Sequence, residues 1–159
     1  MGEWRLATVT SSNVIAEMLN GMVHGMSSVI PKLITKGQLE RLEHALTQLE
    51  IGVLIGITGD SHSRMIIEGK LEAFSSLANH MFGMSLEGEM LESFVGELGN
   101  MVGGSMCTYA SNQGIFLDIT HPTVLVGKTR LTGFQTALSM PMLIESIGDL
   151  RVSLLLEAV

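Results

Sequence analysis

The chain has 159 residues, of which 46% are hydrophobic, so it is long and apolar enough to bury the core of one domain. Its net charge of −7, from 16 acidic and 9 basic residues, disfavours binding to nucleic acid or to anionic lipid. No apolar run approaches the ~20 residues that cross a bilayer, no segment resembles a signal peptide, and the single cysteine, Cys107, fits a reducing compartment, so we expect a cytoplasmic protein.

Residues 10–31 predict the first helix. Serine and asparagine residues that favour a helix start stand near its beginning, and Pro31 ends it. Between them, apolar side chains recur at steps of four, four, four and three, at Val14, Met18, Met22, Met26 and Val29. This spacing is typical of an amphipathic helix that buries one face.

Residues 38–50 leave two interpretations open. Their leucines have helical spacing, yet the segment passes without a stop signal into residues 49–58, which predict a buried strand. Residues 59–63 have the composition of a turn, and residues 64–69 predict a second strand, so the two strands form a hairpin. Residues 70–83 predict a helix that ends at a glycine.

A long helix is predicted over residues 87–109, followed by four strand-like runs at residues 114–120, 122–127, 131–142 and 149–159. The count is three helices and about six strands, arranged in separate blocks. Strands that follow one another across short turns favour an antiparallel sheet with long helices packed on it. We therefore expect one α+β domain that spans residues 1–159.

The long helix carries four glycines within residues 96–105, each of which costs roughly 1 kcal/mol relative to alanine in a helix interior. On a wheel at ~100° per residue, Asn100 lies on the outward face with Gly96, Gly103 and Gly104, and Glu97 lies at its border. We expect this face to be bare so that another protein can dock, although tight packing inside the protein is the alternative. The opposite stripe is apolar and is expected to face the sheet; it contains Met90, Leu91, Phe94, Val95, Leu98, Met101, Val102, Met106 and Tyr109.

Glu97 and Asn100 are three residues apart, so their side chains share one side of the helix. An asparagine is neither an acid nor a base near neutral pH, but its amide can hold a water molecule. A carboxylate can orient water or bind a cationic group. The pair therefore suits a reaction that needs a positioned water rather than a strong base, such as hydrolysis of an acyl phosphate.

The segment "GELGNMVGGS" resembles the Glu-x-x-Asn helix of the CheC/CheX/FliY family of chemotaxis phosphatases, and most of all its CheX members. The segments "LIGITGD" and "LDITHPTVLVG" resemble the corresponding strands, and the likeness runs from Gly52 to the C-terminus. It implies a CheX-like fold, a homodimer and dephosphorylation of a phosphorylated CheY-like receiver domain. By this resemblance Asn100 orients the attacking water, and Glu97 pairs with a lysine of the receiver. The Mg²⁺ ion belongs to the receiver, so this chain needs no cofactor or metal of its own.

A second Glu-x-x-Asn pair, Glu17 and Asn20, lies in the first predicted helix. Members of the CheC type carry two such pairs, so a second site is one interpretation and chance spacing on a polar helix face is the other. The five histidines show no spacing typical of metal ligands. A non-catalytic domain that docks signalling or flagellar-switch proteins remains the alternative to a phosphatase, and the sequence does not name the receiver.

Overall fold

The structure is a computed structural model that describes residues 11–42, 45–46 and 50–157. In these ranges it has three helices, α2 (Ser11–Val29), α3 (Leu71–Phe82) and α4 (Gly88–Asn112). The strands are β1 (Ile34–Lys36), β2 (Glu40–Leu42), β3 (Ala45–Leu46), β4 (Ile51–Gly59), β5 (Ser63–Gly69), β6 (Leu117–Ile119), β7 (Thr123–Val126), β8 (Arg130–Leu131), β9 (Thr136–Ile144) and β10 (Gly148–Leu156). The α+β class predicted from the sequence is confirmed.

Eight strands form one sheet in the order β1-β9-β10-β5-β4-β6, with β2 also paired to β9 and β7 to β4. Every pairing in it is antiparallel, and the predicted hairpin of β4 and β5 aligns Val53 with Ile67. The six strands expected from the sequence correspond to β4, β5, β6, β7, β9 and β10. The short strands β1 and β2 bring the sheet to eight, and β3 and β8 form a separate pair.

The ambiguous residues 38–50 contain no helix where the structure describes them. Strand β2 pairs with β9, so that Glu40 lies opposite Ser139 and Leu42 opposite Ala137. Leu42 also packs against a small apolar cluster that includes Ile66. Pairing with a strand almost 100 positions away therefore outweighs the helical spacing of the leucines. Leu49 lies outside the described residues.

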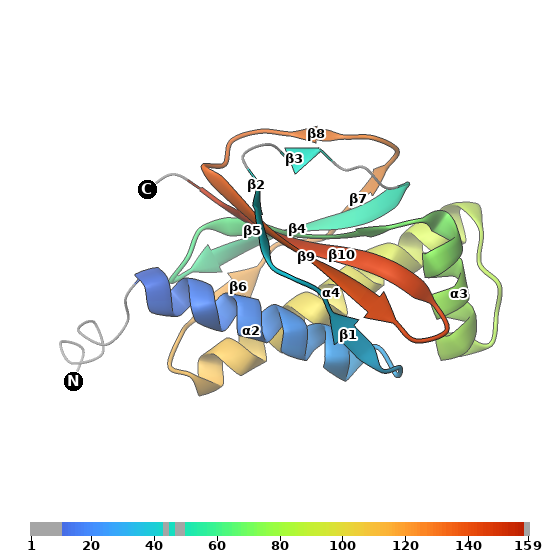
Figure 1. The fold of residues 1–159 in the computed structure, drawn as a ribbon, viewed down its shortest axis with the longest axis horizontal. Helices are drawn as coiled ribbons and strands as arrows, with labels where there is room; N and C mark the ends of the chain where they lie inside the picture. The colour runs from blue at the N-terminus through green and yellow to red at the C-terminus, as the bar shows by residue number, and fades with distance from the viewer. Residues whose placement is uncertain (1–10, 43–44, 47–49, 158–159) are drawn as a thin grey trace.

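The main core lies between one face of the sheet and the helices. Helices α2 and α4 run side by side across that face, while α3 packs near one end of α4 (Figure 1). As predicted, α2 buries the side chains of Val14, Met18, Met22 and Met26. Strands β3 and β8 lie on the opposite side of the sheet (Figure 1). The unbranched methionines fill the space between helix and sheet, as expected from the scarcity of aromatic residues.

Helix α3 ends where the sequence predicts. Gly83 adopts the left-handed conformation, with φ of 71°, and its N–H donates a hydrogen bond of 2.7 Å to the carbonyl oxygen of Asn79. The positive φ favours glycine, so the chain turns here and leads into α4. Helix α4 runs to Asn112, three residues beyond the predicted end. No helix in the described ranges has both the length and the apolar character of a membrane span.

Candidate functional site

The glycines of α4 bring its backbone close to the sheet. A β-carbon added at Gly99 would lie 2.6 and 2.7 Å from the two methyl carbons of Val53 in β4. One added at Gly103 would lie 3.2 Å from Cδ1 of Ile119, and one at Gly96 would lie 3.3 Å from Cγ2 of Val124. The expectation that Gly96 and Gly103 lie on a bare outward face is therefore wrong. Tight packing inside the protein explains them, and the neighbour is the sheet.

Because of this packing, α4 is rotated about its own axis relative to the orientation that its hydropathy pattern predicts. Met90 and Met101, which were expected to face the sheet, are 59% and 40% exposed. Glu97, expected at the border, is exposed together with Asn100. The glycines occupy part of the inward face and add no apolar side chain to it, so hydropathy alone places the buried stripe incorrectly.

Glu97 and Asn100 stand on the outward face of α4, one helical turn apart. In the part of the chain that the structure describes, neither side chain has a hydrogen-bond or ion-pair partner. Gly104 lies one further turn along, and outside its own helical turns no described atom would lie within 4 Å of a β-carbon added there. The amide of Asn100 and the carboxylate of Glu97 are therefore free to bind water or another molecule.

The second pair, Glu17 and Asn20, is already engaged within the protein. The Asn20 side-chain amide donates a 3.3 Å hydrogen bond to Oε1 of Glu17. Partial burial, and then the negative charge of Glu17, raise the pKa of the Tyr109 hydroxyl on α4. The ring of Tyr109 in turn lies 5.3 Å from that of His24. This pair therefore lies in the contact between α2 and α4.

Close packing of α2 on α4 explains the glycines that follow Asn20. A β-carbon at Gly21 would lie 2.9 Å from Cγ of Met106, and one at Gly25 would lie 2.8 Å from the carbonyl oxygen of Val102. Because later residues of α2 meet earlier residues of α4, the two helices run antiparallel. These glycines let the helix backbones approach each other, as small residues do at close helix contacts.

Cys107 has the character of an ordinary helix thiol. It is half-buried, and burial, followed by the negative charge of Asp118, raises the pKa of its thiol. A reactive thiolate requires the opposite environment, with a cationic neighbour. Among the described residues we found no group of three or more histidine, cysteine, aspartate or glutamate side chains that could hold a metal ion.

The fold and the exposed pair together define a class of protein, an α+β domain that displays a Glu-x-x-Asn helix on its surface. The family described as "Chemotaxis phosphatase CheX" matches residues 51–143, a segment that includes Glu97 and Asn100. The chain belongs to this family. The match confirms the resemblance inferred from the sequence segments around the long helix.

Individual relatives agree with this assignment. The CheY-P phosphatase CheX of Thermotoga maritima is 26% identical over 148 residues, covering 87% of this chain and 95% of the relative. Chemotaxis protein CheX of Desulfovibrio desulfuricans has a TM-score of 0.75 at 17% identity, covering 91% of this chain and 99% of that one. The structure of the CheX–CheY–BeF3–Mg²⁺ complex of Borrelia burgdorferi has a TM-score of 0.72 at 18% identity. The match covers 91% of this chain and 97% of that one. These likenesses confirm the fold.

Proposed function

We propose that the chain is a phosphatase that hydrolyses the aspartyl-phosphate of a CheY-like receiver domain. Its family and the function named for the Thermotoga relative support this proposal. The observation that carries it is the contrast between the two Glu-x-x-Asn pairs. Glu97 and Asn100 are exposed and free, whereas Asn20 is bonded to Glu17. A receiver domain meets such a partner in the cytoplasm, where we place the chain.

The chemistry requires little more than positioning. An aspartyl-phosphate is an acyl phosphate, so its carboxylate is already a good leaving group. A water molecule attacks phosphorus in line, the bond between phosphorus and the aspartyl oxygen breaks, and aspartate and inorganic phosphate are released with the water protons on phosphate or solvent. The Asn100 amide would accept a hydrogen bond from this water, or donate one to it, and so hold it in line.

Glu97 would fix the orientation of the two proteins. In the proposed complex its carboxylate pairs with a lysine of the receiver, one helical turn from the water held by Asn100. The receiver would also hold the Mg²⁺ ion, which neutralises charge on the phosphoryl group when bound. This chain would then supply the amide and the carboxylate, and the receiver would supply the cations.

The decisive test replaces Asn100 with alanine. We expect kcat to fall about a hundredfold, equivalent to ~2.7 kcal/mol of lost transition-state stabilisation, because the water is no longer held. The side chain is exposed, and alanine is the better helix former, so the melting temperature should stay the same or rise slightly. The measurement is release of phosphate from receiver domains phosphorylated with a small phosphodonor.

Asn112→Ala is the matched control, because Asn112 is an exposed asparagine at the C-terminal end of the same helix. It should retain the activity of the wild-type protein. If Asn100→Ala were as active as wild type on a receiver that wild type clearly dephosphorylates, Asn100 would have no catalytic role. If wild type bound receivers without hydrolysing their phosphate, the non-catalytic docking domain would be the correct interpretation.

A further inference from the structure

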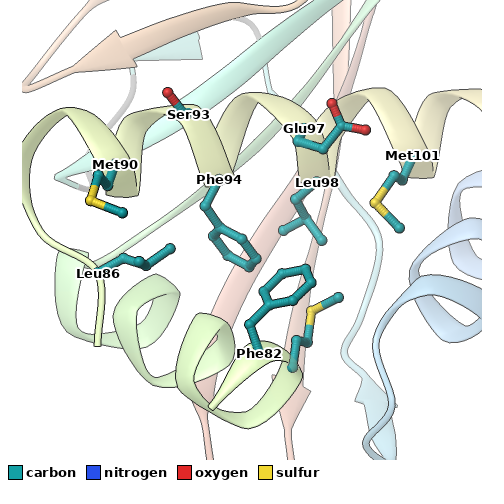
Figure 2. A pocket seen from close by; sticks show the side chains of 9 residues that line it. Phe82, Leu86, Met90, Ser93, Phe94, Glu97, Leu98 and Met101 are labelled. Carbon is teal, nitrogen blue, oxygen red and sulfur yellow. The ribbon is translucent and has the colours of Figure 1, made fainter. Parts of the chain in front are cut away.

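An apolar groove lies between α3 and α4, directly beside the proposed site. It has a volume of about 260 Å³, and we call it the α3–α4 groove. Figure 2 shows Phe94 and Leu98 pointing from α4 toward Phe82 at the end of α3. The residues that line it are Met81, Phe82, Leu86, Met90, Ser93, Phe94, Glu97, Leu98 and Met101.

Three of the apolar side chains that line the α3–α4 groove are exposed in the described chain, whereas Phe94 and Leu98 are buried. Phe82 is 60% exposed although its ring packs edge-on against Phe94, with the ring centroids 5.9 Å apart. Met90 and Met101 are exposed on the α4 side, one on each side of Glu97. Such a group of large apolar side chains around a hollow is typical of a binding surface.

Glu97 is the single charged residue in the lining, and it belongs to both the groove and the proposed site. In Figure 2 its carboxylate points away from Phe82, while Leu98 and Met101 extend from α4 on the same side as Phe82. From Met90 to Asn100 the helix rises about 15 Å. A standard interface covers about 800 Å² of each partner, a patch roughly 30 Å across. A partner that brings a phosphoryl group to Asn100 therefore also covers the groove.

We propose that the α3–α4 groove receives an apolar side chain of the receiver domain, an inference that rests on the proposed function. The receiver would present this side chain within one or two helical turns of the cation that pairs with Glu97. The buried apolar side chain contributes most of the binding affinity. The ion pair with Glu97 fixes how the receiver is oriented on this chain, because charged groups beside an apolar anchor set the orientation of a complex. The groove thereby selects among receivers that share the same phosphorylated aspartate.

The test measures binding and turnover separately. The probe is a CheY-like receiver domain, loaded with beryllofluoride and Mg²⁺ for the dissociation constant Kd and phosphorylated for steady-state kinetics. We expect Phe82→Ser to raise Kd and KM about tenfold while kcat stays within about twofold, because binding is lost without disturbing the water. Phe116→Ser is the matched control, since Phe116 is also 60% exposed but lies beyond the C-terminal end of α4.

A second variant, on α4, shows whether an effect of Phe82→Ser comes from the groove or from a structural change in α3. Met90→Gln keeps the length and helix propensity of the side chain while making the groove wall polar, and we expect it to raise Kd severalfold. Unchanged Kd and KM in both variants would overturn the groove proposal and leave the phosphatase proposal intact. If both variants bound the receiver more weakly but the wild-type protein hydrolysed no aspartyl-phosphate, the groove proposal would stand and the phosphatase proposal would be rejected.

Two further experimental outcomes would overturn the groove proposal. If Phe82→Ser and Met90→Gln change the mass of the protein in light scattering but not its binding to the receiver, the groove is covered by a second copy and the proposal is wrong. If the wild-type chain binds no beryllofluoride-loaded receiver at all, both the groove proposal and the phosphatase proposal fail.

Discussion

At the residue scale, the two Glu-x-x-Asn pairs show that a motif becomes a site only when its polar groups are free. One N–H of the Asn20 side-chain amide is already donated to Glu17, which fixes the orientation of that amide. A typical intramolecular hydrogen bond contributes about 0.5–1.5 kcal/mol. The half-buried Glu17 also lies against α4, so a receiver lysine has less access to it than to Glu97.

We therefore expect one active pair rather than two. The double variant Glu97→Ala/Asn100→Ala should lose almost all phosphatase activity. The double variant Glu17→Ala/Asn20→Ala should keep kcat/KM within about twofold of wild type. Both are compared by release of inorganic phosphate at equal protein concentration. If the first variant kept about half of the activity, α2 would carry a second site.

The residues of the proposed site could be identified from the sequence because Glu97 and Asn100 form a short local pattern. The helical wheel predicted the exposure of Asn100, whereas it placed Glu97 only at the border of the outward face. The groove beside them could not be predicted, because Phe82 and Met90 come from different elements. Their meeting depends on how α3 packs against α4. A single exposed phenylalanine before Gly83 gives no signal of that arrangement.

At the element scale, α4 is held flush against the sheet by residues that lack side chains. Val53 in β4 lies under Gly99, and its β-branched side chain cannot rotate away cheaply in a buried strand. Gly104, on the outward face, meets nothing within 4 Å among the described residues outside its own turns. A larger side chain therefore has no room at Gly99, whereas Gly104 of the same helix has room for one.

Gly99→Ala and Gly104→Ala provide a direct comparison of these requirements. Both gain about 1 kcal/mol of helix propensity, so the difference in their free energy of unfolding reports the steric cost at Gly99 alone. Overpacking of a core typically costs about 1–3 kcal/mol, and we expect Gly99→Ala to be less stable by that amount. The measurement is denaturant unfolding of both variants. Equal stability would show that α4 shifts outward at no cost.

Prediction from sequence succeeded where an element carries its own periodicity. The steps of three and four in α2 and the apolar runs of β4 and β10 place these elements correctly. It failed for the orientation of α4, because Gly96 and Gly103 do not show in the sequence whether they face a sheet or a partner. It also left β1 and β2 undetermined, since three-residue strands depend on pairing with the distant β9.

At the scale of the whole molecule, the sheet has exposed edges that are suited to association. Strand β1 pairs on one side with β9, where Thr35 lies opposite Leu143. Leu143 is exposed, and so is Leu33, which immediately precedes β1. An edge strand with apolar side chains beside it is a template for pairing with another chain. This edge is therefore our candidate for the interface of a homodimer.

We expect the wild-type chain to form a dimer at micromolar concentration, with β1 at or near the interface. The double variant Leu33→Lys/Leu143→Lys should shift the mass toward that of a monomer, because lysines at an edge oppose pairing and repel each other. Light scattering coupled to size-exclusion chromatography measures both proteins. A monomeric wild-type chain at high micromolar concentration would contradict this expectation.

The separation of α4 into a packed face and an open face has a consequence for signalling specificity. Changes at Gly99 or Gly103 disturb the fold, whereas changes at Met90, Ser93 or Gly104 lie outside the core. A duplicated copy of such a domain could therefore acquire a new receiver through a few outward substitutions while its framework stayed intact. Parallel signalling pathways built on these domains could then be insulated from crosstalk by the surface of a single helix.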